Sequence, residues 1–283
     1  MSAVISNQRA VDLLLNSMDM KPRALRSTES PTHAPDERVA KFALSYLDAF
    51  GYLKNELNAW KDITLDDILN AIGHFQNMFG LKRSKALDVR TVRAMEAPRC
   101  GYPDIVRSRH AEVKSVARAA KANLAKWQKS GVTYTIAEYL PGMAKQDMEV
   151  IVRRAFDAWE AHGQINITRA ASGDTPDIVI SVGRGRQSNF DGPGGMLAWA
   201  YMPTESGSQL TAKFDLDEVW TLSDSQRGTR LYNVACHEFG HLLGLGHSKV
   251  PSALMAPYYN AAIGEPQPVD DIPRFQLRYG KRT

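Results

Sequence analysis

The chain has 283 residues, of which 43% are hydrophobic and 23% are charged. This composition is typical of a globular protein with one large domain or two smaller ones, and it excludes a fully disordered or fibrous chain. The formal net charge is +4, yet residues 105–129 alone hold seven basic residues and one acidic residue. No nucleic-acid partner is expected, because the basic character is confined to one segment.

The sequence predicts neither a membrane span nor a signal peptide. The apolar run at residues 11–15 is short and is interrupted by Asp12, which does not fit the apolar core of a leader. Two cysteines are too few for a disulfide framework. Cys236 is therefore predicted to be a small buried residue, and a Cys100–Cys236 disulfide is the less favoured alternative.

The N-terminal third is predicted to be helical after a flexible start. Residues 1–35 contain a weak helical stretch followed by a Pro/Ser/Thr-rich piece, and they are predicted to form a flexible segment. Residues 36–104 carry three short helices, the second beginning near Thr64 and Asp67 and the third spanning about 88–96. The apolar stripes comprise Val39, Ala43, Tyr46, Leu47 and Phe50, then Ile68, Ile72, Phe75 and Phe79, then Val89, Val92 and Met95.

The basic residues 105–123 are predicted to form an exposed linker that a trypsin-like protease can cut. A second domain is expected from 124 to 283. Alternation at residues 132–136 predicts an edge-type strand, and apolar spacing at 148–159 predicts a long amphipathic helix. Further strands are predicted at 165–169, 177–182, 197–201 and 211–216, and further helices at 229–245 and around 271–279.

The most informative motif is H-E-x-x-H-x-x-G-x-x-H, formed by residues 237–247. On a helix, residues four apart share a face, so His237 and His241 can offer two imidazoles to one metal ion. Gly244 permits a sharp exit from the helix, after which His247 can return as a third ligand. A solvated helix that happens to carry histidines is the alternative, but it leaves this spacing unexplained.

The ligand set indicates a catalytic metal site. Three protein ligands leave the fourth position of zinc open to water, whereas structural sites are closed. Glu238 is adjacent to the first ligand and is predicted to act as the general base toward that water, without being a ligand.

Two further motifs carry a resemblance to a family. Residues 253–259 read A-L-M-A-P-Y-Y and resemble the Met-turn of the metzincins, in which Met255 lies beneath the zinc histidines. Residues 98–104 read P-R-C-G-Y-P-D and resemble the cysteine switch of matrix metalloproteinase zymogens. A thiolate is a good zinc ligand, so Cys100 in the fourth position would exclude the water. The alternative for Cys100 is an ordinary thiol.

The chain thus resembles the matrix metalloproteinases over residues 40–280, in the minimal matrilysin-like layout without a hemopexin domain. The resemblance implies an α+β fold, in which a small three-helix propeptide precedes a metzincin catalytic domain. That domain would have a twisted, mostly parallel five-stranded sheet and three helices. The helical unit also resembles peptidoglycan-binding modules, which leaves a binding role as a minor alternative.

The resemblance also implies the function. It implies a monomeric zinc endopeptidase, made as a latent zymogen, that a second protease activates and that cleaves proteins of the extracellular-matrix type. A secreted location follows from the family, although no signal peptide is predicted here. The rival interpretation is a catalytically silent metal-binding or regulatory protein that retains the fold.

A calcium ion is also expected from the resemblance. Its predicted ligands are carboxylates of Asp191, Asp215 and Glu218 and carbonyls of Gly192, Gly194 and Met196, which are the hard oxygen donors that calcium prefers. Turn glycines beside solvated acids are the alternative.

The second, structural zinc of the family is not expected. No histidine lies between His162 and His237, and Trp199 and Lys213 occupy the usual ligand positions. The prediction is one zinc per chain.

The resemblance places the substrate cleft along residues 197–200. Leu197 and Ala198 are predicted to pair with an extended peptide through main-chain hydrogen bonds. Pro257 and Tyr259 are predicted to wall the main specificity pocket, and Asn233 is predicted to line it and to alter the preferred side chain.

Overall fold

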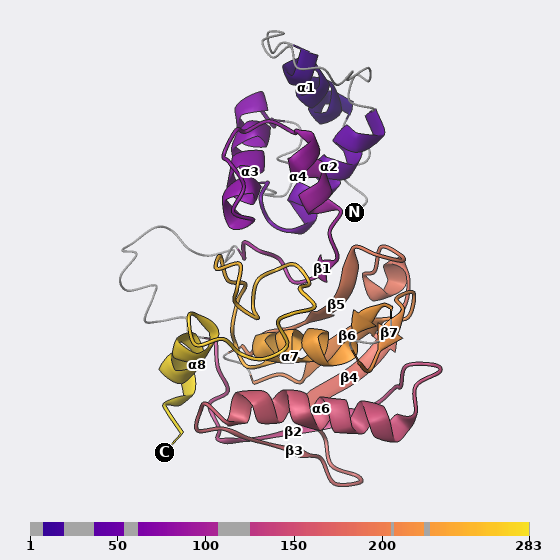
Figure 1. The fold of residues 1–283 in the computed structure, drawn as a ribbon, viewed down its shortest axis with the longest axis vertical. Coiled ribbons are helices and arrows are strands. Elements are labelled where there is room, and N and C mark those ends of the chain that lie inside the picture. The colour runs from indigo at the N-terminus through magenta and orange to yellow at the C-terminus, as the bar shows by residue number, and fades with distance from the viewer. Residues whose placement is uncertain are drawn as a thin grey trace. The chain divides into compact units, whose positions relative to one another are not determined.

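The computed structural model describes residues 8–19, 37–53, 62–106, 125–204, 207–223 and 227–282 (Figure 1). The chain forms two compact units. The first comprises Met1–Glu96 with Pro103–Arg107, and the second comprises Ala97–Tyr102 with Ser108–Thr283. The basic linker was predicted at residues 105–123, and its residues from 107 onward lie outside the described ranges. No helix in the described ranges is long and apolar enough to cross a membrane.

The first unit is helical. It contains α1 (Gln8–Asp19), α2 (Glu37–Ala49), α3 (Leu65–Met78) and α4 (Val89–Met95). The prediction of a flexible segment over residues 1–35 is wrong for α1, because Ala10, Val11 and Leu14 are buried and this helix packs on α2 and α3. Helix α1 corresponds to the weak helical stretch predicted within residues 1–35, and α2, α3 and α4 are the three helices expected after it.

Helix α3 begins as its sequence predicts. The Thr64 hydroxyl accepts a hydrogen bond from the Asp67 amide at 3.2 Å, and the Asp67 carboxylate accepts one from the Thr64 amide at 3.1 Å. This reciprocal capping box satisfies two amides that a helix start otherwise leaves unpaired. The apolar face of the helix then packs Phe75 against Tyr46 and Tyr52, with ring centroids 5.3 and 5.7 Å apart.

The last residues of the P-R-C-G-Y-P-D motif are tied to this helical unit. The Asp104 amide donates to the Phe50 carbonyl at 3.1 Å, and the Tyr52 hydroxyl donates to the Asp104 carboxylate at 2.5 Å. Gly51 has φ +81°, and a Cβ there would lie 2.2 Å from the Ile105 carbonyl oxygen. Only glycine suits this close approach.

The second unit is built on a six-stranded sheet. The strand order is β1-β5-β6-β4-β2-β3, and every neighbouring pair is parallel except β5–β6. The strands are β1 (Arg99–Cys100), β2 (Gly131–Ile136), β3 (Asn166–Arg169), β4 (Ile178–Gly183), β5 (Met196–Ala200) and β6 (Leu210–Asp215). A small separate sheet pairs β7 (Trp220–Thr221) with β8 (Thr229–Arg230).

The mostly parallel α+β fold is confirmed, with two differences from the expectation. The sheet has a sixth strand, because the segment around Cys100 adds β1 beside β5. The prediction that residues 132–136 form an edge strand is wrong, since β2 pairs with β3 on one side and β4 on the other. The alternation that suggested an edge instead reflects Val132, Tyr134 and Ile136 facing the core.

Helices α6 (Lys145–Glu160), α7 (Leu231–Leu242) and α8 (Asp271–Tyr279) complete this unit, together with a 3₁₀ turn, η2 (Arg186–Ser188). Helices α6 and α7 pack together through the rings of Phe156 and Phe239, which stack with centroids 4.1 Å apart. The Trp159 indole donates to the Cys236 carbonyl at 2.8 Å. Cys236 is buried as predicted, and both cysteines are free.

The exit from α7 depends on a glycine. Gly244 has φ +88°, and a Cβ at this position would lie 1.9 Å from the Ala125 carbonyl oxygen. Both the left-handed backbone and the close approach exclude other residues. The chain can therefore leave α7 sharply and return toward its histidines, as the motif predicted.

Candidate metal centre

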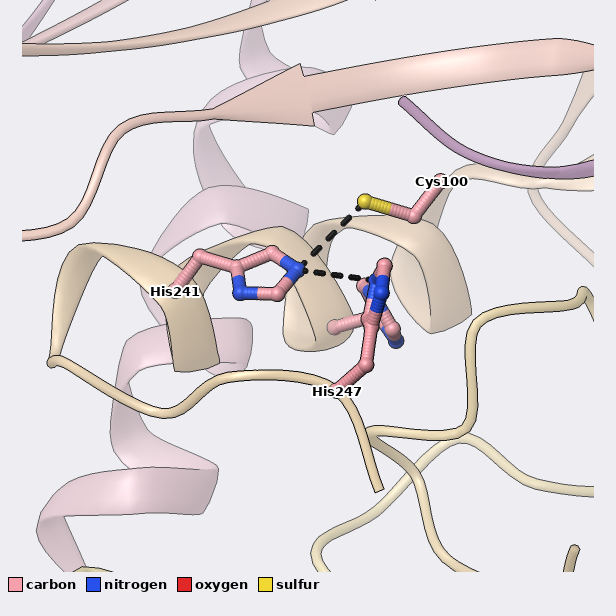
Figure 2. Close-up of side chains that lie close together, drawn as sticks. Cys100, His241 and His247 are labelled. Atoms are coloured by element: carbon pink, nitrogen blue, oxygen red, sulfur yellow. Dashed lines mark hydrogen bonds between the residues drawn. The ribbon is translucent and has the colours of Figure 1, made fainter. Parts of the chain in front are cut away.

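Four side chains converge at the end of α7. His237 and His241 lie on one face of the helix, His247 comes from the loop that follows, and Cys100 comes from β1. Their ligand atoms all lie within 4.8 Å of one another, and no other such group occurs among the described residues. Cys100 Sγ is 3.4 Å from His241 Nε2, which is 3.3 Å from His247 Nε2 (Figure 2).

The hydrogen bonds of the histidines leave ligand atoms facing this centre. His241 Nδ1 donates to the Leu245 carbonyl and His237 Nδ1 donates to the Leu254 carbonyl, each at 2.7 Å. In a neutral imidazole the other nitrogen is then unprotonated and offers a lone pair. A tetrahedral zinc ion with nitrogen ligands at about 2.05 Å has edges of about 3.3 Å. The donor set and its spacing therefore fit zinc.

Burial shifts the pKa of His241 and the pKa of the Cys100 thiol in opposite directions. Burial, followed by the neighbouring His247 and His237, holds the pKa of His241 well below its usual value, so the ring stays neutral. Burial and the nearby Glu238 carboxylate raise the pKa of the Cys100 thiol. A bound divalent cation acts in the opposite direction, because it deprotonates a coordinating thiol. The protonation state of this thiol consequently depends on whether a metal ion is bound.

Glu238 lies beside the centre without joining its ligand group. Its side chain is fully buried, and both carboxylate oxygens lack a hydrogen-bond partner within the described ranges. Burial raises the pKa of Glu238 to about 8, and the Cys100 thiol opposes that rise. A cation bound beside it would favour the charged form of this carboxylate, which is the form that can accept a proton.

The segment around Cys100 lies between two stretches of backbone, residues 195–198 and residues 257–259. On one side, the amides of Arg99 and Gly101 donate to the carbonyls of Gly195 and Ala198, each at 2.7 Å. On the other side, the Cys100 amide donates to the Pro257 carbonyl at 3.0 Å, and the Tyr259 amide donates to the Pro98 carbonyl at 2.8 Å. The predicted cleft residues Ala198, Pro257 and Tyr259 thus hold this segment by backbone hydrogen bonds.

Tyr102 also covers the centre, and the sequence analysis missed it. Its ring stacks on His241 with centroids 4.5 Å apart and an interplanar angle of 29°, and its amide donates to Cys100 Sγ at 3.2 Å. Burial raises the pKa of Tyr102 to about 12, so its hydroxyl stays protonated. Tyr102 occupies the variable position of the P-R-C-G-x-P-D motif, and for that reason the motif alone did not single it out.

Met255, the residue that the resemblance assigns to the Met-turn, packs against α7 at Gly240. It is fully buried, and a Cβ built on Gly240 would lie 2.3 Å from its sulfur. The turn is held by Asp271, a second residue that the sequence analysis missed. The buried Asp271 carboxylate accepts hydrogen bonds from the amides of Leu254 at 2.7 Å, Met255 at 3.1 Å and Gln267 at 2.9 Å. From sequence alone it reads as an ordinary first-turn acid of a helix.

We expect Asp271→Ala to lower the free energy of unfolding by about 3–5 kcal/mol, because two buried amides and one partly buried amide lose their acceptor. Asp157 is a matched control, since its carboxylate is 61% exposed and pairs with Arg153. We expect Asp157→Ala to change stability by no more than about 1 kcal/mol. Denaturant unfolding of both variants tests this, and equal effects would contradict it.

A small cavity opens beside His237 and Glu238. It has a volume of about 30 Å³, and its lining includes four of the predicted substrate-binding residues, Leu197, Asn233, Pro257 and Tyr259. Asn233 is only 3% exposed. Its amide nitrogen donates to the carbonyls of Ala261 at 3.0 Å and Asn260 at 3.5 Å, which ties the loop after the Met-turn to α7.

The predicted calcium ligands lie where the chain enters β5 and where it leaves β6. The Asp191 carboxylate accepts from the Met196 amide at 3.0 Å, and Glu218 accepts from the Gly194 amide at 2.6 Å. Asp215 is fully buried, and its Oδ2 accepts no hydrogen bond from the described residues. Burial first, and the charges of neighbouring acids second, raise the pKa of Asp215 and Glu218. A buried carboxylate oxygen of this kind fits a hard cation.

A different contact occupies the expected place of a structural zinc. Trp199 on β5 is opposite Lys213 on β6, with the ammonium 5.9 Å from the indole ring. The Trp199 indole N–H donates to the Ser188 carbonyl at 2.9 Å, which holds η2 against the sheet. Neither side chain is a ligand that zinc sites normally use.

We therefore expect one zinc per chain in the purified protein. Metal analysis of the full chain measures this directly. Two zinc ions per chain would contradict the prediction, and substitution of His241 by Ala should release the single ion.

Comparison with known proteins agrees with this geometry. The Matrixin family model matches residues 126–280. Matrilysin of Rattus norvegicus is 35% identical over 247 residues, which cover 85% of this chain and 88% of the relative. Matrix metalloproteinase-20 of Homo sapiens is 35% identical over 86% of this chain, and matrix metalloproteinase-18 of Xenopus laevis is 39% identical over 74%. The matched region spans 49% and 43% of those two relatives. The chain belongs to the matrixin family.

Proposed function

We propose that this protein is a zinc-dependent endopeptidase made in a latent form. The observation that carries the proposal is the convergence of three histidines and Cys100 beside the buried Glu238. Family membership supports a zinc peptidase, and the substrates we propose are proteins of the extracellular matrix. The location we propose is extracellular, and the acting species is a monomer.

His237, His241 and His247 would hold the zinc ion, which would supply Lewis-acid activation of a water and of the scissile carbonyl. Glu238 would accept a proton from the attacking water and pass it to the leaving amine. Ala198 and Pro257, which now hold the segment around Cys100, offer the same main-chain groups to an extended peptide. The side chain beside the scissile bond enters the cavity lined by Asn233 and Tyr259.

Latency follows from two features of the segment around Cys100. The thiol takes the position that water needs, and residues 98–101 take the backbone hydrogen bonds that a substrate needs. A protease that cuts within residues 105–123 would release the thiol from the metal and residues 98–101 from the cleft. N-terminal sequencing of the activated protein tests this. A new terminus beyond Tyr134 would contradict it, because β2 is an interior strand of the sheet.

A calcium ion would support the cleft from the loops at Asp191, Asp215 and Glu218. The unpartnered Oδ2 of Asp215 supports this part of the proposal. The carbonyls of Gly192, Gly194 and Met196 complete the proposed ligand set.

The direct test is hydrolysis of a quenched-fluorescent peptide before and after limited trypsin treatment, with zinc content measured on the same samples. Activity that appears only after cleavage supports a latent endopeptidase. Bound zinc without activity after complete cleavage would contradict it and would favour the catalytically silent metal-binding protein.

We expect Asn233→Leu to change which side chain the pocket prefers. The substitution removes a buried amide and its two hydrogen bonds to the following loop, and it adds apolar surface to the lining. We expect the preference for peptides with a large apolar side chain over a small polar one to rise about tenfold in kcat/KM. A peptide with Ala at that position is the internal control, and unchanged relative rates would contradict the prediction.

A further inference from the structure

Helix α8 contacts the turn that joins two of the metal ligands. The turn runs from the end of α7 through Gly244 and Gly246 to His247. Arg278 Nε donates to the Gly244 carbonyl at 2.9 Å, and Arg274 Nη2 donates to the Gly246 carbonyl at 2.6 Å. The Tyr279 hydroxyl donates to the Leu243 carbonyl at 3.1 Å. Side chains of one helix thus bind three carbonyls between His241 and His247.

Both guanidinium groups are held in place by further contacts. Arg274 Nη1 is 2.8 Å from the Asp270 carboxylate, and Arg278 Nη1 donates to the Arg274 carbonyl at 2.8 Å. Arg278 is partly buried, and this burial lowers the pKa of its guanidinium group. The helix itself is anchored in the core by Phe275 and Tyr279. The two arginine side chains are therefore held by their own contacts and extend from a helix that is anchored in the core.

The peptide units that they bind also orient the ligands. The Leu245 carbonyl accepts the hydrogen bond from His241 Nδ1 at 2.7 Å, and it lies between the two carbonyls that the arginines bind. His247 directly follows Gly246. Backbone hydrogen bonds from the Leu245 amide to the Gly240 carbonyl at 2.9 Å and from the Gly244 amide to the His241 carbonyl at 2.8 Å close the start of the turn. The arginine contacts add side-chain hydrogen bonds to the carbonyls on both sides of Leu245.

We infer that Arg274 and Arg278 are positioning residues for the metal centre. They hold the turn so that Leu245 orients His241 and so that His247 faces it. The inference rests on the proposed function only in taking the ion to be zinc. Groups that orient metal ligands typically change metal affinity by 10- to 100-fold when they are removed.

A purely electrostatic effect predicts the opposite change in zinc affinity. Arg274 is close enough to His241 for its positive charge to lower the pKa of that ring. Two cations near a divalent ion repel it, so a purely electrostatic effect would make a neutral substitution strengthen zinc binding. A positioning role makes the same substitution weaken it. The direction of the change therefore distinguishes the two effects.

The test is zinc affinity of the full chain, measured by competition with a chromogenic chelator. We expect Arg274→Met with Arg278→Met to weaken zinc binding by about 10- to 100-fold, and Arg274→Lys to retain part of the affinity. Arg282 is the matched control, because its guanidinium donates to the Glu160 carbonyl away from the centre. We expect Arg282→Met to leave the affinity within about twofold, as surface changes usually do.

The thermal midpoint of each metal-free variant separates folding from positioning. If the double variant does not fold, the Arg274→Lys and Arg278→Met single variants provide the same comparison. Zinc affinity that is unchanged or higher in a folded variant would overturn the inference. The readout needs no peptidase activity, so a chain that binds zinc but never cleaves peptides would contradict the proposed function alone.

Discussion

Glu238→Gln is expected to reduce peptide hydrolysis by the activated protein by about 10²- to 10⁴-fold, the usual contribution of a general base. The substitution keeps the size of the side chain and removes its ability to take a proton. Among the described residues the ligand group contains no carboxylate that could replace Glu238 as the base. The kcat/KM for a quenched-fluorescent peptide, measured after removal of residues 1–123, checks the prediction.

Zinc content is the control for Glu238→Gln. Because Glu238 is outside the ligand group, the variant should still bind one zinc per chain. Hydrolysis within tenfold of the unmodified protein would contradict the role of Glu238. Loss of zinc would instead show that Glu238 supports the ligand geometry.

Cys100→Ala is expected to make the uncleaved chain partly active, because residues 98–101 are then held in the cleft by backbone hydrogen bonds alone and a substrate can displace them. The alanine side chain offers no ligand atom, so the fourth position of the metal becomes accessible to water. A tethered thiolate acts at an effective concentration in the millimolar range, and its removal should raise the rate of the uncleaved chain by about 10²-fold or more. Peptide hydrolysis without trypsin treatment measures this.

Two comparisons sharpen the Cys100→Ala experiment. Cys236→Ala removes the other buried thiol, which lies outside the ligand group, and it should leave latency intact. A Cys100→Ala chain that stays inactive until it is cleaved would show that residues 98–101 block the cleft without the thiol. That outcome would contradict the proposed switch.

The sequence alone predicted the centre because its spacing is local. His237, His241 and Gly244 lie within one helix and its exit, so the helical repeat and one left-handed residue determine where they go. The Thr64–Asp67 cap was predictable for the same reason. Cys100 required a motif, because no periodicity connects residue 100 with residue 241.

The features that were missed depend on contacts between distant parts of the chain. Asp271 binds the amides of Leu254 and Met255, and Tyr102 stacks on His241, yet nothing near either residue in sequence indicates its partner. The interior position of β2 was missed for a related reason. An alternating pattern shows that one face is buried, but it does not show how many neighbours a strand has.

Helix α1 illustrates a different limit. Its apolar run at residues 11–15 is short and is interrupted by Asp12, so the sequence indicated only a weak helical stretch. In the structure these side chains are buried, and the helix packs on α2 and α3. Tertiary packing of one apolar face stabilised a segment whose sequence alone was weakly helical.

The proposed latent state requires Cys100 and three histidines to share one zinc ion in the uncleaved chain. X-ray absorption at the zinc edge measures the ligand atoms directly. We predict three nitrogen ligands and one sulfur ligand before cleavage, with the sulfur replaced by oxygen after trypsin treatment. Zinc without a sulfur ligand in the uncleaved chain would contradict the proposal that Cys100 binds the metal.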